Sequence, residues 1–455
     1  MRPLVLVTGP PATRSGYGAH TRDLIWALIG MDRFDIHINS LRWGNTPMNA
    51  LNEQDPKDKL IIDRLLTSDS LPRQPDIHFQ ISVPNEFTPI AKYNIGITAG
   101  MENTIPKPEW IEGLNRMDMN IAVSEFVKAT FTSSIYDRVD EKTKQPVGEL
   151  KLIKPMEVLF EGADLNIYKK TKEFSKELVD EMEKIPEKFV FLYTGHWLQG
   201  DLGQDRKDTG MLVKTFLETF SNKKNQPALV LKTSGHSFSI IDRNTMLQKV
   251  ADIKNTVKGK LPNVYILHGD LMDEEMNELY NHPKVKAHIT FTHGEGFGRP
   301  LLEACFSEKP VIAPDWGGQK DFLNNKNAVL LPGTLIDVHK SAVPKEMLQS
   351  GAQWFAVNYQ YAGQMMFKVF KEYKKYTLPA KRLAISNRAK FSLEGMDKKF
   401  EEILDKYLPK FEEIPQAVNL KLPKLRKVNT SDNDKGSMGV PTKKLPQLKK
   451  VNHGK

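Results

Sequence analysis

Two carboxylates and three glycines stand close together in the segment His293–Ala304. Gly296 and Gly298 carry no side chain, so the backbone there can approach a ligand closely. A strand, a glycine turn and a helix N-terminus in succession form an anion site, because free N–H groups and the helix dipole point at the ligand. Glu295 and Glu303 would repel phosphate and are better suited to accept hydrogen bonds from hydroxyl groups. A nucleotide sugar carries both kinds of group; the alternative is a tight turn with two solvated acids.

Short apolar segments alternate along the chain with longer amphipathic segments. Most of the short segments are β-branched or aromatic and are followed by turn signals. The first series is Leu4–Thr8, Ile36–Ser40, Ile77–Ile81, Tyr93–Thr98 and Met119–Val123. The second series is Phe189–Thr194, Ala228–Thr233, Val264–His268, Ala287–Phe291 and Pro310–Ala313. This alternation predicts an α/β protein with two doubly wound, Rossmann-like domains, each built on a parallel sheet with crossover helices.

The two series divide the chain into an N-terminal domain, residues 1–168, and a C-terminal domain, residues 186–375. After Pro344 the pattern is mostly helical, and residues 380–408 are predicted to form helices that close the fold. Apolar periodicity then fades while Pro, Lys, Asn and Ser dominate. Residues 416–455 are therefore predicted to be a disordered tail.

The composition excludes several classes of protein. The chain has 455 residues, 40% hydrophobic and 27% charged, as expected for a globular protein with a substantial core. No stretch approaches 18 consecutive apolar residues, so a transmembrane helix is not expected. Cys305 is the only cysteine, which excludes an intramolecular disulfide and a cysteine-based zinc site. We therefore expect a reducing compartment, the cytoplasm.

The tail concentrates positive charge and contains a repeat. It holds ten Lys and Arg residues and only two acids, so it carries +8 of the net charge of +9. The segment Lys421–Asn429 recurs as Lys444–Asn452, with seven of nine positions identical. One interpretation is a pair of docking motifs for a polyanion, such as DNA or an anionic membrane, or for a protein. The other is a local duplication in an unconstrained tail.

The spacing Glu295-x7-Glu303, followed by Pro310–Ala313 and Trp316–Asp321, resembles the signature of retaining GT-B glycosyltransferases. Within that group it is most similar to family 4 of the nucleotide-sugar-dependent transferases. Other pieces in family order are Ser15–Gly18, Glu102–Trp110, Val158–Tyr168 and the basic pair Arg206-Lys207. The resemblance covers residues 1–405. It implies two Rossmann-like domains facing each other across a cleft, with a terminal helix returning to the first domain.

The resemblance also implies roles on the donor side. Lys207 and Arg206 would hold the donor diphosphate, and Glu295 would bind sugar hydroxyls and orient the donor. Glu303 would bind the ribose hydroxyls. The remaining donor-side residues would contact sugar or phosphate through the backbone or line the base; they are Gly296, Phe297, Gly298, Leu271 and Asp273.

On the acceptor side the resemblance implies a glycine loop with Gly16 and Gly18 and a block that begins at Glu102. The acceptor itself is not identified. The reaction would transfer a sugar with retention of anomeric configuration, without a protein nucleophile, a cofactor or a metal. A D-x-D sequence occurs only at Asp432–Asp434, in the tail, so no metal site is expected.

Three departures from the family pattern affect these expectations. His196 stands where the family often has an arginine, so the phosphate clamp would depend mainly on Lys207. Glu161 begins the stretch that usually reads Asn-Gly-Val-Asp, and Glu102 lies where many members carry a histidine. Two other functions remain open: a DNA-modifying glycosyltransferase tethered by its basic tail, and a non-catalytic sugar-nucleotide or nucleic-acid binder on the same scaffold.

Overall fold

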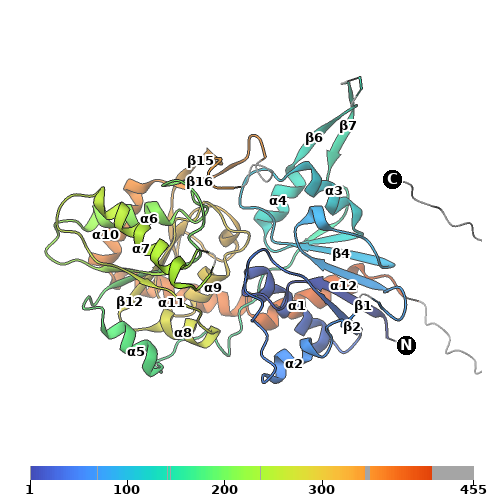
Figure 1. Cartoon of the computed structure of the whole chain (residues 1–455), viewed down its shortest axis with the longest axis horizontal. Coiled ribbons are helices and arrows are strands. Elements are labelled where there is room, and N and C mark those ends of the chain that lie inside the picture. Colours follow the sequence, from blue (N-terminus) through green and yellow to red (C-terminus); the bar gives the residue numbers. More distant parts are fainter. Residues whose placement is uncertain are drawn as a thin grey trace, which may run out of the picture. The chain divides into compact units, whose positions relative to one another are not determined.

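The computed structural model describes residues 2–411 except 69, 141, 144, 236 and 344–348. The predicted tail, with both copies of its repeat, lies outside the described residues. Two six-stranded sheets form the framework, and all of their strand pairs are parallel (Figure 1). The predicted α/β fold with two Rossmann-like units is therefore confirmed. Among the described residues no helix has the length and apolarity needed to cross a membrane.

The N-terminal lobe is built on one sheet in the order β2-β1-β3-β4-β5-β8. Its strands are β1 (Leu4–Gly9), β2 (Asp35–Ser40), β3 (Ile77–Ile81), β4 (Tyr93–Thr98), β5 (Met119–Ala122) and β8 (Met156–Val158). Its helices are α1 (Gly16–Gly30), α2 (Pro56–Ile62), α3 (Pro108–Arg116) and α4 (Glu125–Ser133). Strands β1, β3 and β5 are buried along their whole length, as expected for a parallel sheet covered on both faces.

The C-terminal lobe is built on the second sheet, in the order β11-β10-β9-β12-β13-β14. Its strands are β9 (Val190–Thr194), β10 (Ala228–Lys232), β11 (Val264–Leu267), β12 (Val285–Ile289), β13 (Val311–Pro314) and β14 (Val329–Leu331). Its helices are α5 (Lys176–Glu183), α6 (Thr209–Phe220), α7 (Ile240–Asn255), α8 (Asp273–Asn281), α9 (Arg299–Cys305), α10 (Tyr359–Lys371) and α11 (Lys374–Lys390).

The order of the strands determines where a ligand can bind. In the C-terminal sheet the chain moves outward from β9 to β11 and then returns to the other side of β9 with β12. In doubly wound sheets the crevice at such a reversal, beyond the carboxyl ends of the strands, is the usual ligand site. The loops that leave this point are residues 195–208 after β9 and residues 290–298 after β12.

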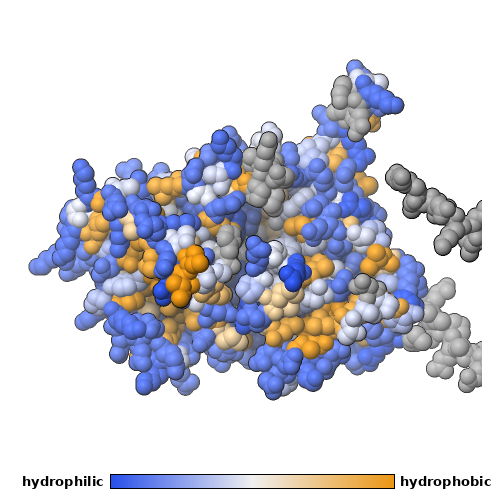
Figure 2. All heavy atoms as spheres, viewed as in Figure 1, coloured by the Kyte–Doolittle hydropathy of each residue, from blue (hydrophilic) through white to orange (hydrophobic). Residues whose placement is uncertain are grey.

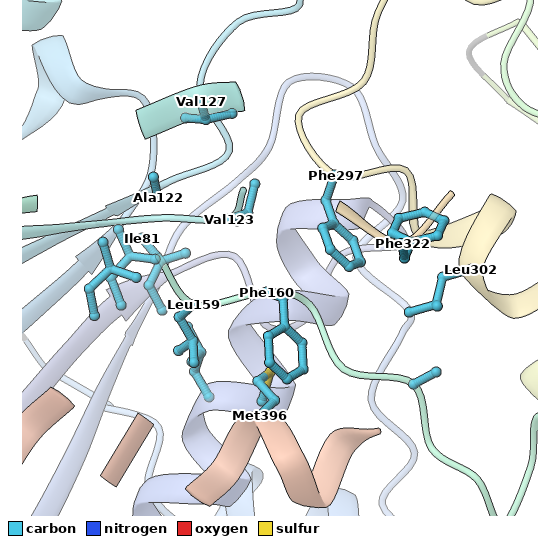
Figure 3. Close-up of a cluster of buried hydrophobic side chains, with 14 of the residues drawn as sticks. Ile81, Ala122, Val123, Val127, Leu159, Phe160, Phe297, Leu302, Phe322 and Met396 are labelled. Carbon is cyan, nitrogen blue, oxygen red and sulfur yellow. The ribbon is translucent and has the colours of Figure 1, made fainter. Parts of the chain in front are cut away.

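The last described helix, α12 (Leu393–Tyr407), packs on the N-terminal lobe although it follows the C-terminal lobe in sequence. Phe400 meets Phe79 of β3 edge to face at 5.8 Å. Met396 lies beside Phe160 and Leu159 in a buried apolar cluster that also contains Phe297 and Phe322 of the C-terminal lobe (Figure 3). The apolar core is therefore continuous between the two lobes.

Two antiparallel hairpins were not predicted from the sequence. One joins β6 (Ile135–Val139) to β7 (Pro146–Lys151) and extends away from α3 and α4 (Figure 1). The other joins β15 (Gly333–Asp337) to β16 (Gln353–Val357). The chain described after Pro344 is mostly helical, as predicted, and β16 is a strand that this prediction did not include. This strand is buried because it packs its aromatic residues against the loop at His293.

The surface in the view of Figure 2 is mostly hydrophilic, with separate hydrophobic patches. One of these patches lies over the start of α7, where Ile240 and Ile241 are 69% and 79% exposed. They lie at the start of α7, before the residues that this helix buries, which are Met246, Val250 and Ile253.

Candidate active site

The loops after β9 and β12 bring two cations and two carboxylates together. Lys207 donates from Nζ to Oε1 of Glu295 at 2.5 Å. Arg206 donates from Nη1 to Oε1 of Glu102 at 2.6 Å, and the same nitrogen lies 3.9 Å from Oε2 of Glu295. Only 12% of each of the Lys207 and Glu295 side chains is exposed. Four residues that the sequence analysis selected from three distant segments thus form one charge cluster.

The electrostatics of the cluster favour ionised side chains. Burial acts to raise the pKa of Glu295, but the charges of Lys207 and Arg206 outweigh it and hold the pKa below its ordinary value. Burial lowers the pKa of Lys207, and the Glu295 carboxylate opposes that shift. The two cations are therefore balanced by two carboxylates. An anionic ligand could replace a carboxylate as the partner of either cation.

Buried polar contacts fix the backbone around Arg206 and Lys207, which together are called the clamp. Asp208 follows the clamp in the left-handed conformation, with a φ of 48°, and its Oδ2 accepts a hydrogen bond from the hydroxyl of Tyr359 at 2.8 Å. Asp205 accepts a hydrogen bond from the backbone N–H of Thr209 at 3.1 Å. These contacts hold the start of α6, so Lys207 needs little reorganisation to meet a ligand.

His293 serves as a structural link rather than a free base. Its Nδ1 lies 2.8 Å from the carbonyl oxygen of Phe355, and its Nε2 lies 3.2 Å from that of Gly203. The ring also stacks on Trp354 at 4.4 Å. The backbone N–H of His293 donates to the carbonyl oxygen of Arg206 at 2.9 Å, so the histidine connects the β15–β16 hairpin to the clamp.

The glycine turn before α9 touches the N-terminal lobe directly. The carbonyl oxygen of Gly296 accepts a hydrogen bond from the hydroxyl of Ser124 at 2.5 Å. A Cβ atom at position 296 would lie 2.3 Å from the carbonyl oxygen of Ala99. Gly298 has a φ of 97°, which strongly favours glycine. Phe297 points into the apolar cluster, where its ring lies 5.1 Å from that of Phe322 (Figure 3), so its backbone N–H is its polar group for a ligand.

Glu303 lies behind this turn in a second buried charge group. Arg299 donates from Nε to Oε1 of Glu303 at 3.0 Å and from Nη1 to Oδ2 of Asp23 on α1 at 2.5 Å. Burial raises the pKa of Glu303 to about 8, although the charge of Arg299 opposes that shift. The negative charge of Asp273, at the start of α8, also raises the pKa of Glu303. Leu271 lies just before Asp273 and packs against the core.

The predicted glycine loop starts α1 at the carboxyl end of β1. Ser15 caps the helix by accepting a hydrogen bond from the backbone N–H of Gly18 at 3.0 Å. A Cβ atom at Gly18 would lie 2.2 Å from the carbonyl oxygen of Thr13, whereas nothing lies within 4 Å of one at Gly16. Gly18 is thus required by packing, and Gly16 leaves open space.

Sequence reasoning missed three contacts around the glycine turn, one within the N-terminal lobe and two between the lobes. Tyr17 accepts a hydrogen bond from the backbone N–H of Ala99 at 3.0 Å and so connects the glycine loop to the segment that meets Gly296. Ser124 and the Asp23–Arg299 ion pair are the other two. Ser124 also caps α4 by accepting a hydrogen bond from the backbone N–H of Val127, but the sequence analysis assigned it no contact, and no motif selects Asp23.

His196, which departs from the family pattern, and Lys232, which ends β10, both have structural partners. His196 Nδ1 lies 3.2 Å from the hydroxyl of Ser234, and burial lowers the pKa of this histidine to about 4. Lys232 donates to the carbonyl oxygen of Gly269 at 2.8 Å. Within the described part of the chain, no group of three or more His, Cys, Asp or Glu side chains could hold a metal ion.

Comparison with known proteins gives a family match and a fold match. Residues 213–347 match the family model described as glycosyl transferases group 1. This segment includes Glu295 and Glu303 and begins just after Lys207. No curated protein sequence matches the chain.

Solved structures share the fold along most of the chain. HepE from Anabaena, in complex with UDP-glucose, is 14% identical, with a TM-score of 0.57; the match covers 89% of this chain and 100% of that chain. A glycosyltransferase from Rickettsia africae is 18% identical, with a TM-score of 0.55 and coverage of 90% and 100%. Sucrose-phosphate synthase from Thermosynechococcus elongatus is 12% identical, with a TM-score of 0.57 and coverage of 89% and 99%. The fold is therefore the GT-B fold.

Proposed function

We propose, from the match to glycosyl transferases group 1 and the GT-B fold, that this chain transfers a sugar from a nucleotide-sugar donor to an acceptor, with retention of anomeric configuration. The observation that carries the proposal is the buried Lys207–Glu295 pair beside the glycine turn at the carboxyl edge of the sheet. This arrangement offers cations for a diphosphate and a carboxylate for sugar hydroxyls within one hydrogen-bonded cluster.

In the proposed reaction the bond between the anomeric carbon and the diphosphate oxygen breaks. Negative charge then develops on the departing nucleoside diphosphate. In this proposal Lys207, Arg206 and the backbone N–H groups of Phe297 and Gly298 stabilise that charge, as preorganised groups in a partly buried site do. The acceptor oxygen bonds to the same face of the anomeric carbon, and its proton passes to the leaving phosphate. Glu295 orients the donor through its sugar hydroxyls.

The test of this function is a panel of UDP-, GDP- and ADP-sugars. Each donor is scored by thermal shift for binding and by hydrolysis for turnover. NMR of the released sugar reports its anomeric configuration. A wild-type chain that binds and turns over none of these donors would contradict the proposal. Binding without turnover would instead favour a non-catalytic sugar-nucleotide binder.

We expect activity that does not require a metal ion. Lys207 and Arg206 supply the positive charge that a divalent cation provides in other transferases, and their partners hold them in place before the donor arrives. Turnover of the best donor should therefore survive excess EDTA. Complete loss of turnover in EDTA, restored by Mg²⁺ or Mn²⁺, would contradict the cationic clamp.

The tail suggests a second element of function, docking of a polymeric partner. Residues 416–455 carry ten cations and two copies of one motif, and cations bound to a polyanion release counterions. Two linked copies also raise avidity through effective concentration. We favour DNA as the partner because the tail has an excess of cations and few apolar residues. In that case the chain would be a DNA-modifying glycosyltransferase.

Deleting residues 416–455 should leave donor binding unchanged and weaken binding to DNA at low salt. Altering one copy of the motif should weaken DNA binding less than altering both copies. The measurement is DNA binding at low and moderate salt by the full-length and truncated chains, with anionic liposomes as a parallel arm. Equal binding by both forms would contradict a docking role, and loss of liposome binding alone would point to a membrane partner instead.

A further inference from the structure

Glu161 is a buried carboxyl that has no partner in the described part of the chain. It follows β8, only 7% of the residue is exposed, and no hydrogen bond or ion pair joins its side chain to any residue that the structure describes. Its neighbours along the chain are tightly held. Ala163 donates from its backbone N–H to the carbonyl oxygen of Phe391 at 3.0 Å, and Leu393 donates back to Ala163 at 2.8 Å. The backbone thus fixes where this carboxyl lies.

The surroundings of Glu161 place it at the candidate active site. Phe160, the residue before it, packs its ring 5.0 Å from that of Phe391, and the Phe391 ring lies 6.4 Å from that of Phe297 in the glycine turn.

The charges that act on Glu161 belong to Arg299 of α9, Asp23 of α1 and Glu295 of the glycine turn. The charge of Glu161 in turn helps to raise the pKa of the Tyr17 hydroxyl in the glycine loop. Arg299 and Glu295 belong to the C-terminal lobe, and Asp23 and Tyr17 belong to the N-terminal lobe. Glu295 is also the hydrogen-bond partner of Lys207.

The nearby cation does not neutralise Glu161 through a direct contact. Arg299 directs its Nη1 to Asp23 at 2.5 Å and its Nε to Glu303 at 3.0 Å. Asp23 and Glu303 thus take the two side-chain hydrogen bonds that the structure shows for Arg299, and neither goes to Glu161. Asp23 and Glu295 repel a charge on Glu161 as well.

No described residue hydrogen-bonds to the carboxyl oxygens of Glu161, and these oxygens are not among the fully enclosed polar atoms, so a ligand in the site can reach them. Burial of most of the side chain still disfavours its ionised form. Burial raises the pKa of Glu161 to about 7, and the charge of Arg299 only partly opposes that shift. Near neutral pH the free protein therefore populates both the protonated and the ionised carboxyl. A hydroxyl group that enters the site would supply the hydrogen bond that the ionised form lacks.

We propose that Glu161 is a further binding residue of the site and that its carboxylate accepts a hydrogen bond from a substrate hydroxyl. This inference rests on the proposed function. The hydroxyl belongs either to the donor or to the acceptor, and the same carboxyl chemistry serves both. Because the hydrogen bond favours the ionised form, binding lowers the pKa of Glu161 and releases a proton. Binding of the substrate that carries the hydroxyl should therefore strengthen as the pH rises through 7.

The first arm of the test measures donor binding with UDP-glucose by titration calorimetry, at pH 6 and pH 8 and in two buffers of different ionisation enthalpy. If the hydroxyl is on the donor, Glu161→Gln should weaken binding at pH 8 by about tenfold, as for loss of one hydrogen bond to a charged group. The variant should also release fewer protons than the wild-type chain. Glu303 can contribute protons of its own, so the informative quantity is the difference between the two chains.

The second arm measures hydrolysis of UDP-glucose, with water as the acceptor, between pH 5.5 and 8.5. If the hydroxyl is on the acceptor, Glu161→Gln should leave donor affinity unchanged and remove the rise in turnover near pH 7. The matched control is Glu157→Gln on β8, whose carboxylate is already bonded to Lys406 and Tyr407 outside the site. That variant should retain the wild-type pH dependence in both arms.

Thermal unfolding shows whether the variant folds. The raised pKa of Glu161 means that the folded wild-type chain loses stability as the pH rises from about 4.5 through 7, because the unfolded chain ionises more readily. Glu161→Gln should therefore unfold near the wild-type temperature at pH 5 and at a higher temperature at pH 8.

Two outcomes separate this inference from the proposed function. If the wild-type chain binds UDP-glucose but Glu161→Gln matches it in affinity, proton release and pH profile, Glu161 is not a binding residue and the proposed function stands. If the wild-type chain binds neither UDP-glucose nor another donor of the panel, the proposed function fails and the role of Glu161 fails with it.

Discussion

Replacing Lys207 with alanine should lower turnover of the nucleotide sugar by about two to three orders of magnitude, the effect typical of losing one preorganised group that stabilises developing charge. Lys207 is buried and its Nζ lies 2.5 Å from Glu295, so its charge is held in place before the donor arrives. The measurement is the initial rate of donor hydrolysis or transfer at saturating donor. Because the charge develops in the transition state, kcat should fall more than donor affinity.

Glu295→Gln should cause a loss of similar size, because the amide keeps the shape of the side chain but cannot balance Lys207. The two residues touch, so the double variant should lose less than the product of the two single losses. Lys214→Ala is the matched control, because Lys214 lies on α6 and its ammonium is 4.0 Å from Glu218, away from the site. Near-wild-type turnover in both Lys207→Ala and Glu295→Gln would show that these two residues do not stabilise the leaving group or orient the donor.

Gly296→Ala should lower turnover by about a hundredfold, since a misplacement of about 1 Å can have that effect on a reacting geometry. The added Cβ would lie 2.3 Å from the carbonyl oxygen of Ala99, whereas ordinary contacts begin near 3.4 Å. That neighbour is backbone, so the glycine turn and the segment at Ala99 must move apart. The displacement would reach Glu295, the preceding residue, and the hydrogen bond from Ser124.

Gly30→Ala is the control for this substitution, because nothing lies within 4 Å of a Cβ atom there and Gly30 ends α1 far from the turn in sequence. Both variants should remain folded, and the difference should appear in the rate. A Gly296→Ala chain that retains full turnover would mean that the close contact between the glycine turn and Ala99 is not needed for the reaction.

The strands that the sequence predicted are short segments, most of them β-branched or aromatic and followed by turn signals, and all ten are present. Two of the four edge strands, β8 and β14, were missed because each has only three residues. Each forms a strand only by pairing with the strand beside it, β5 or β13. The hairpin β6–β7 was missed for another reason. Most of its described residues are exposed, so it lacks the apolar alternation that marks a strand against a core.

For the site, motif and spacing were enough to select the residues around Glu295, but not their partners. Arg206 and Glu102 are 104 positions apart, and nothing in either segment indicates that they form an ion pair. Asp23 looks like an ordinary polar residue on an amphipathic helix until α9 brings Arg299 to it. Such pairs depend on how the two lobes meet, which local patterns do not encode.

The return of α12 to the N-terminal lobe has a consequence for synthesis on the ribosome. Domains usually fold in the order in which they are made. Here the N-terminal lobe is made first, yet its core includes Phe400 and Leu404, which are made near the end. The strands and α10 of the C-terminal lobe end at residue 371, so that lobe can complete its sheet earlier. The nascent N-terminal lobe therefore exposes an apolar face until α12 has been synthesised. Premature termination before α12 would destabilise the N-terminal lobe, although the missing residues lie near the other end of the chain.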